Sequence, residues 1–232
     1  MLDPQAQTLL QLMVERGIPA FNAQTPVEAR QAYLMRKGFT QPDPPAVSHC
    51  HDHLVLLNGV NIKIREFRPD GATAVEVLPA LVYYHGGGWV IGDIKTHHPF
   101  CQALSAATDC SVIALDYRLA PEHVFPAAQD DCLAATQWIA RHAEQLGTCN
   151  GRLVIAGDSA GGHLATCTCL EIDPDTRKSI CGQVLIYPGL GGNMTQGSYR
   201  THAKAPMLTL DDVLFYKDIR HGSPAPTDDP TV

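Results

Sequence analysis

Residues 153–164 read LVIAGDSAGGHL, and this stretch decides the fold. It opens with a continuously apolar run, typical of a strand buried on both faces, and closes in a helical stretch. Between them lies G-x-S-x-G, in which Gly157 and Gly161 flank Ser159, because a sharp turn from strand to helix leaves room only for small neighbours. The pattern predicts a strained turn that exposes the Ser159 hydroxyl at a helix N-terminus, where the Ala160 N–H and the helix dipole favour an oxyanion.

Three further apolar runs of the same kind lie on either side of this stretch. They are Ala80–Tyr84, Ser111–Leu115 and Val184–Tyr187. Helical stretches separate the runs, among them residues 126–141, which have one apolar face behind an initial proline. The alternation predicts an α/β fold, with a mostly parallel central sheet, right-handed crossovers and helices on both faces. Because the carboxyl ends of such strands meet at one edge, His85, Asp116 and Ser159 should converge there.

A second motif, HGGGW at residues 85–89, directly follows the first of these runs. On its own the serine motif also fits a plain glycine-rich turn. Three glycines after a strand, however, let backbone N–H groups approach a substrate oxygen without a Cβ in the way. We therefore expect an oxyanion hole formed by Gly86, Gly87, Gly88 and Ala160, in which one donor typically contributes about 3 kcal/mol of transition-state stabilisation.

Polar residues beside these motifs are expected to support the site. His85 precedes the expected donors, which favours anchoring of the loop over catalysis. Asp158 is adjacent to Ser159, and neighbouring side chains diverge, so we expect it to make turn hydrogen bonds and not to align a histidine. Asp116 and Glu122 are expected to fix their own loop by hydrogen bonds.

Four motifs in a fixed order give the chain a family resemblance. They are His85 to Trp89 (HGGGW), Asp116 to Glu122 (DYRLAPE), Phe125 to Ala128 (FPAA) and Gly157 to His163 (GDSAGGH). Together they resemble the bacterial hormone-sensitive-lipase-like carboxylesterases of the α/β-hydrolase fold. The resemblance implies Ser159 as nucleophile, oxyanion donors from Gly87, Gly88 and Ala160, and hydrolysis of short-chain acyl esters through an acyl-enzyme. It also implies a helical lid.

This resemblance and the local patterns divide the chain into four segments. We expect an N-terminal helical lid segment at 1–45, an α/β-hydrolase core at 46–188, a second lid segment at 189–223, and the start of a truncated C-terminal core segment at 224–232. In the first segment, Thr25 and Glu28 flank Pro26 in a pattern that predicts a capped helix start. The prolines of residues 41–45 predict a linker, and Asn58-Gly59 predicts a hairpin turn beyond it.

In this fold the acid and the base of the triad follow the serine along the chain. Too few residues follow Ser159 for two further strand-helix units, so we expect the triad Asp and His not to be present in this chain. His202 and His221 lie in the second lid segment, and a lid seldom holds a base within about 3 Å of the serine oxygen. Two hypotheses stay open: a serine carboxylesterase, or a catalytically impaired fragment or small-molecule binding module on the same fold.

Composition and charge limit the classes of partner that the chain is expected to bind. The net charge is −7 and the 17 Lys and Arg form no basic run, which argues against nucleic acid. No apolar stretch is long enough for a membrane span, and the N-terminus lacks the basic start and apolar core of a signal peptide, so we expect a cytoplasmic protein. The expected partner is a small-molecule ester, without a cofactor. A sheet that ends early would expose an apolar edge, which leaves a homo-oligomer open.

Cysteine and histidine offer two alternative chemistries. The 8 cysteines are scattered without a CxxC pair, which predicts reduced thiols and neither disulfides nor zinc. His49, His51 and His53 alternate and would share one face of a strand, where imidazoles could bind a metal. Because they precede the hairpin in the expected linker, we interpret them as solvated and expect no metal site.

Overall fold

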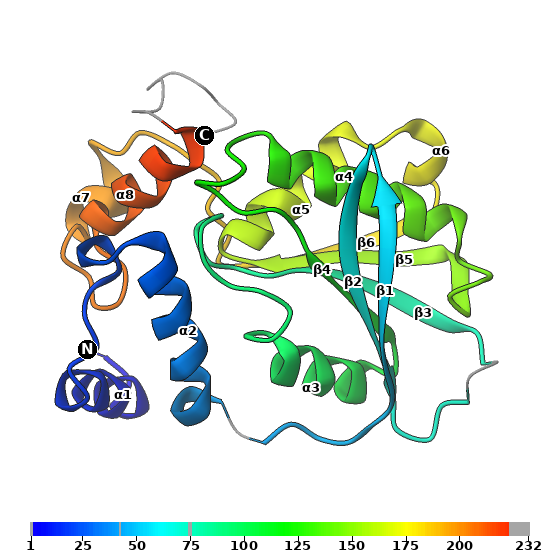
Figure 1. Ribbon diagram of the computed structural model, residues 1–232, viewed down its shortest axis with the longest axis horizontal. Helices are drawn as coiled ribbons and strands as arrows, with labels where there is room; N and C mark the ends of the chain where they lie inside the picture. Colours follow the sequence, from blue (N-terminus) through cyan, green and yellow to red (C-terminus); the bar gives the residue numbers. More distant parts are fainter. Residues whose placement is uncertain (1, 42, 74–75, 223–232) are drawn as a thin grey trace.

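A computed structural model describes residues 2–41, 43–73 and 76–222 and contains a six-stranded sheet in the order β1-β2-β4-β3-β5-β6 (Figure 1). The strands are β1 (Val47–Leu57), β2 (Val60–Pro69), β3 (Leu78–Tyr84), β4 (Ser111–Asp116), β5 (Thr148–Asp158) and β6 (Ile180–Ile186). The last four are mutually parallel, whereas β1 and β2 run antiparallel to their neighbours. The predicted mostly parallel α/β sheet is confirmed.

The four predicted apolar runs coincide with the four parallel strands. β3, β4 and the second half of β5 are almost entirely buried, which explains why their sequences are continuously apolar. β6 forms the edge of the sheet and is more exposed. Tyr187 was expected inside this last strand, but it lies beyond it with a φ of 36°.

The predicted hairpin is confirmed and is longer than expected. Asn58 and Gly59 adopt φ values of 49° and 79°, the left-handed pair that matches the twist of two antiparallel strands. β1 pairs with β2 from this turn back to Val47. The expectation that His49, His51 and His53 lie in a linker was therefore wrong, because pairing with β2 makes this polar stretch part of a strand.

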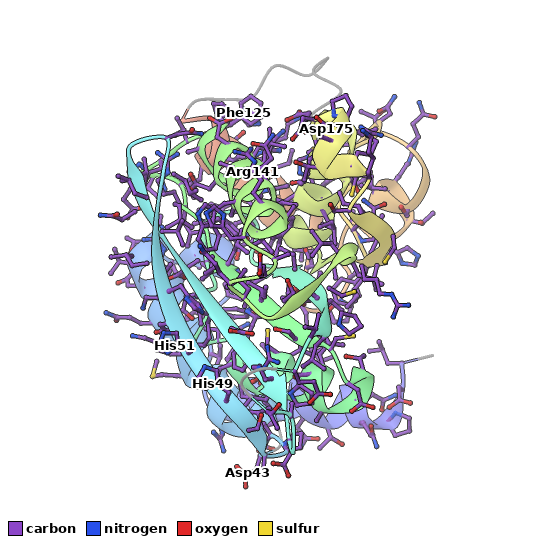
Figure 2. All side chains as sticks on the ribbon, turned by 90° about the vertical axis from the view of Figure 1, so that its right-hand side faces the viewer. Asp43, His49, His51, Phe125, Arg141 and Asp175 are labelled. Atoms are coloured by element: carbon purple, nitrogen blue, oxygen red, sulfur yellow. The ribbon has the colours of Figure 1, made fainter. Side chains whose placement is uncertain are left out.

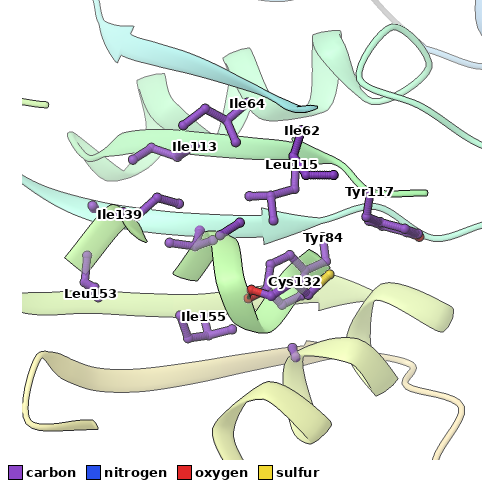
Figure 3. Packing of buried hydrophobic residues seen from close by; sticks show 14 of the residues in the cluster. Ile62, Ile64, Tyr84, Ile113, Leu115, Tyr117, Cys132, Ile139, Leu153 and Ile155 are labelled. Carbon is purple, nitrogen blue, oxygen red and sulfur yellow. Dashed lines mark hydrogen bonds between the residues drawn. The ribbon is translucent and has the colours of Figure 1, made fainter. Parts of the chain in front are cut away.

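Helices cover both faces of the sheet (Figure 1). α3 (His98–Thr108) lies on one face, and α4 (Ala127–Arg141), α5 (Ala160–Glu171) and α6 (Pro174–Arg177) lie on the other. The larger core fills the second face, where Ile113, Leu115, Ile139 and Ile155 are fully buried (Figure 3). Each such side chain contributes about 1.5–3 kcal/mol of hydrophobic free energy, so this core fixes the strands whose ends carry the motifs.

The remaining helices gather beside the carboxyl ends of the parallel strands. They are α1 (Pro4–Glu15), the short η1 (Phe21–Ala23), α2 (Pro26–Thr40), α7 (Gly197–Thr201) and α8 (Leu210–His221) (Figure 1). α2 begins with the predicted reciprocal cap, in which Thr25 N donates to Glu28 and Glu28 N donates to the Thr25 hydroxyl. No helix within residues 2–41, 43–73 and 76–222 is long and apolar enough to cross a bilayer. The segment expected at 224–232 lies outside the described residues.

Candidate functional site

Ser159 lies between the end of β5 and the first residue of α5 and has an unusual backbone, with φ 51° and ψ −116°. Such a conformation is costly for a residue other than glycine, and it persists only where the surroundings hold it. Hydrogen bonds on both sides do so here. Ser159 N donates to Ile186 O over 2.9 Å, and Ser159 O accepts from His163 N over 3.1 Å. The serine is thus fixed between β6 and α5 and stays partly exposed.

The glycines of this turn have no room for side chains. A Cβ on Gly157 would overlap the carbonyl group of Gly161, and a Cβ on Gly161 would overlap Tyr84 O at the end of β3. Close packing of the turn against the neighbouring strand therefore requires both small residues, as expected from the motif.

The glycine loop that follows β3 lies directly beside this turn. β3 and β5 are paired in register, with Tyr84 opposite Gly157, so both strands end at the same level. Gly87 and Gly88 have φ values of 128° and 59°, which L side chains rarely adopt. The Gly87 carbonyl accepts hydrogen bonds from Val90 N at 3.1 Å and from Ile91 N at 2.9 Å. The loop is consequently a defined tight turn.

Asp158 links the two motifs. Its Oδ1 accepts hydrogen bonds from Gly86 N over 2.8 Å and from the Tyr83 hydroxyl over 2.6 Å, and His97 Nε2 lies 3.6 Å away. Burial alone would raise the pKa of Asp158, but its close contact with His97 and its hydrogen bonds with Tyr83 and Gly86 lower the pKa below the ordinary value. The carboxylate is therefore ionised and holds the loop.

Two expectations are corrected by these contacts. Asp158 was expected to make hydrogen bonds within its own turn, but it bonds across to the glycine loop. The Gly86 N–H is used by this carboxylate, so it is not available to a substrate oxygen, and Gly86 leaves the expected set of donors. His97 was missed by sequence reasoning, since it belongs to no motif and meets Asp158 only because α3 packs beneath the strand ends.

His85 is buried and its neighbours immobilise it. Its Nδ1 lies 2.8 Å from Gly86 O, its ring stacks on Tyr117 with centroids 4.3 Å apart, and the Tyr117 hydroxyl donates to His85 O over 2.6 Å. Burial, together with the charge of His97, lowers the pKa of His85 to about 4. The imidazole is therefore neutral at pH 7, and its contacts fit the expected anchoring role.

Arg30 connects α2 to the segment that follows the glycine loop and to the segment that follows β4. Its Nε donates to Val90 O over 2.7 Å and its Nη2 donates to Ala120 O over 2.8 Å. The guanidinium also forms a bidentate pair with Glu122, at 2.8 and 2.7 Å. This pairing lowers the pKa of Glu122 to about 2. Glu122 thus fixes the segment after β4 against α2. Asp116, at the end of β4, accepts a hydrogen bond from Ile94 N over 3.4 Å.

The other singled-out histidines lie on β1, at the end of α7 and on α8. His49, His51 and His53 share one face of β1, with adjacent ring centroids 5.5 and 4.6 Å apart (Figure 2). In the part of the chain that the structure describes, no three His, Cys, Asp or Glu side chains are grouped so that they could hold a metal ion. His202 is exposed at the end of α7, and His221 packs on Phe125 with ring centroids 5.3 Å apart.

The chain is similar in sequence to known ester hydrolases. The chain is 32% identical over 209 residues to the carboxylesterase NlhH of Mycobacterium tuberculosis, covering 90% of this chain and 65% of the relative. It is 31% identical to an ethyl acetate hydrolase of Pseudomonas putida, over 93% of this chain and 70% of the relative. The chain spans between 50% and 65% of the first curated relatives that it matches.

Solved structures agree with these relatives. An ester hydrolase from the metagenome of Lake Arreo, complexed with a derivative of bipyridine phosphonate, superposes with a TM-score of 0.87 at 36% identity, over 94% of this chain and 70% of the other. A family model described as the alpha/beta hydrolase fold (Abhydrolase_3) matches residues 81–232. The matched region contains the glycine loop, the Ser159 turn and the parallel strands that position them. The chain therefore belongs to this α/β-hydrolase family, the hormone-sensitive-lipase-like group that its motifs resemble.

Proposed function

We propose that the chain carries the nucleophile and the oxyanion hole of a carboxylic ester hydrolase that acts on short-chain acyl esters. The observation that carries this proposal is the conformation of Ser159, at φ 51° and ψ −116°, on a turn tied to the glycine loop through Asp158 and Gly86. A strained, partly exposed serine between a strand and a helix is typical of serine hydrolases. The names of the esterase relatives support the same reaction class.

In the proposed reaction, Ser159 Oγ attacks the ester carbonyl carbon while a general base takes its proton. The carbonyl oxygen becomes an oxyanion, which accepts hydrogen bonds from the N–H groups of Gly87, Gly88 and Ala160. Collapse of the intermediate expels the alcohol, which takes up the proton, and leaves Ser159 acylated. Water then hydrolyses the acyl-enzyme to the carboxylic acid and free serine. Loss of one donor would cost about 3 kcal/mol of transition-state stabilisation.

The proposed short acyl chain is supported by one relative, whose name specifies ethyl acetate. A series of p-nitrophenyl esters from acetate to decanoate tests it. We expect kcat/KM to be highest for acetate or butyrate, and a maximum at decanoate would contradict the short-chain preference without affecting the nucleophile.

The nucleophile is tested by covalent labelling. A fluorophosphonate should phosphonylate Ser159, and the intact mass and a peptide map should place one adduct on that residue. Ser159→Ala should abolish both the label and ester turnover, whereas Ser198→Ala, which alters an exposed serine on α7, should change neither. Turnover that survives in Ser159→Ala would overturn the proposal. Saturable binding of the ester without label or product would indicate the second hypothesis, a catalytically impaired fragment or a small-molecule binding module on the same fold.

A further inference from the structure

Trp89, the residue after the glycine loop, is held in an uncommon conformation by contacts that the proposed reaction does not use. Its φ is 61°, a value that bulky side chains adopt only when their surroundings enforce it. Within the described residues its indole N–H is buried and has no hydrogen-bond partner. Contacts of its ring, among them an edge-to-face contact with His163 at 5.3 Å between centroids, and the backbone hydrogen bond from Ala120 N to Trp89 O at 2.9 Å hold the residue.

Arg220, from the last turn of α8, stacks on the face of this ring. Its guanidinium carbon lies 4.3 Å from the centre of the Trp89 ring and 4.9 Å from that of Phe125. The side chain is buried, only 3% exposed, and its Nη2 donates to Gln129 over 2.7 Å. A desolvated guanidinium over an aromatic face is strongly attracted to the ring, and its planar shape lets it stack and donate at once.

α8 also contacts the glycine loop directly. A Cβ on Gly88 would overlap the ring of Tyr216, which lies one turn before Arg220 on α8. The Arg220 carbonyl accepts from Phe125 N over 2.8 Å, which fixes the end of the helix against the chain that leaves β4. α8 therefore contacts two consecutive residues: Gly88 of the glycine loop through Tyr216, and the following Trp89 through Arg220.

We propose that Arg220 is a positioning residue for the proposed ester hydrolysis: by stacking on Trp89 it keeps the preceding Gly87 and Gly88 N–H groups in the orientation that an oxyanion requires. This inference rests on the proposed function. Arg220 touches neither substrate nor Ser159 in this role. It acts through the ring of Trp89, so its removal should lower kcat and leave KM nearly unchanged.

Steady-state kinetics with p-nitrophenyl butyrate test the effect on turnover. Arg220→Met should lower kcat about tenfold or more, since misplaced donors lose part of the stabilisation of a full oxyanion contact, while KM changes less than about twofold. Arg220→Lys should not restore kcat, because an ammonium group cannot stack on two rings and reach Gln129 in the same geometry. Gln129→Leu, which keeps the arginine but removes its acceptor, should give a smaller loss in the same direction.

Arg36 provides a matched control. It is also a buried arginine over an aromatic ring, 4.2 Å from the centre of Phe21, but it belongs to α2. Arg36→Met should lower the melting temperature by a similar amount and leave kcat within about twofold. A parallel loss of kcat in the two arginine variants, or an unchanged kcat in Arg220→Met, would overturn the proposal.

A second readout does not depend on turnover. The chain has 2 tryptophans, so a Trp138→Phe background reports Trp89 alone. Arg220→Met in this background should increase acrylamide quenching of Trp89, and Arg36→Met should not. If the unaltered chain shows no Ser159-dependent turnover, the proposed function fails, and the quenching difference still decides whether Arg220 holds the loop. Equal quenching in all variants would overturn the contact itself.

Discussion

At the scale of single residues, the candidate site consists of backbone N–H groups whose positions depend on a few buried side chains. Asp158 is the clearest of these, because its carboxylate accepts from both Gly86 N and the Tyr83 hydroxyl. A buried donor that loses its acceptor costs about 1–3 kcal/mol. Removal of this carboxylate should therefore affect folding as well as the loop.

Asp158→Ala should lower the free energy of unfolding by about 2 kcal/mol or more, because it leaves both donors without an acceptor. Asp158→Asn retains an oxygen that can accept from Gly86 and Tyr83, so its loss should be clearly smaller. Urea denaturation followed by circular dichroism measures both. Equal stability of the alanine variant and the unaltered chain would show that these hydrogen bonds carry no net stabilisation.

The pKa of His85 gives a prediction about acid stability. In the folded chain this pKa is lowered to about 4, against an ordinary value of 6.5. Between these two values the unfolded chain binds a proton that the folded chain does not, so folding stability falls as the pH decreases from about 6.5 to about 4. The contribution of Asp158, whose pKa is also lowered, is lost only at lower pH, as the pH falls from its ordinary value of 3.8.

We would measure urea unfolding midpoints at pH 7.0, 5.5 and 4.5 for the unaltered chain and for His85→Gln. The comparison separates the effect of His85 from the acid sensitivity of all other groups. The slope of unfolding free energy against pH should be steeper in the unaltered chain, by at most about 1.4 kcal/mol per pH unit. Parallel slopes would contradict a neutral, buried His85.

The motif residues could be predicted from the sequence because steric demands leave few alternatives at their positions. Gly157 and Gly161 flank a serine on a turn that packs against the next strand, and only small residues fit there. The partners of these residues could not be predicted. His97 and Arg220 occur in stretches without a motif, and each reaches the site only through helix packing that depends on the whole fold.

At the scale of secondary-structure elements, α5 approaches β3 so closely that there is no room for a larger side chain at Gly161. A Cβ on Gly161 would overlap backbone atoms of Tyr84 and His85, which cannot move without displacing the glycine loop. Overpacking typically costs 1–3 kcal/mol and more where backbone must shift. Gly161→Ala should therefore lower the free energy of unfolding by about 3 kcal/mol or more.

Gly182 of β6 provides the matched control, because a Cβ there would meet Val154 Cγ2 at an ordinary 3.6 Å. Gly182→Ala should leave the free energy of unfolding unchanged or raise it by up to about 1 kcal/mol, since alanine restricts the unfolded chain. Thermal melts of the two variants give the comparison. Similar melting temperatures would mean that α5 is free to move away from β3.

The elements differed in how far they could be predicted. Hydrophobic runs predicted the four parallel strands, because both faces of these strands are buried. The start of β1 was not predictable, since residues 47–53 are polar and only their pairing with β2 makes them a strand. Strand order was also not predicted, because the antiparallel pairing of β2 with β4 has no local signature.

At the scale of the whole molecule, the helices at the two ends of the described chain meet over the site. A small apolar cluster joins Ala29 of α2 and Tyr216 of α8 to Val90 and Ile91 of the glycine-loop segment. The two proposed lid segments thus share one contact surface with the loop. Within this cluster Tyr216 also lies against Gly88, so α8 is the helix that borders the expected oxyanion donors.

The two edges of the sheet differ in a way that predicts where copies of the chain associate. β1 carries Asp52 and three histidines, and charged side chains on an edge strand discourage pairing. β6 carries no charged residue, and Val184 on it is 47% exposed. An uncharged edge strand with exposed apolar side chains is a template for pairing with a second chain.

The unaltered chain should therefore associate in a concentration-dependent manner, and Val184→Lys should shift it toward the monomer because a charge on β6 must lose water when two edges pair. Leu54→Lys places the same charge on β1, where Leu54 is 69% exposed, and should leave association unchanged. Multi-angle light scattering over a concentration series compares the three chains. A monomer at every concentration, or an effect of the Leu54 variant alone, would rule out β6 as the pairing edge.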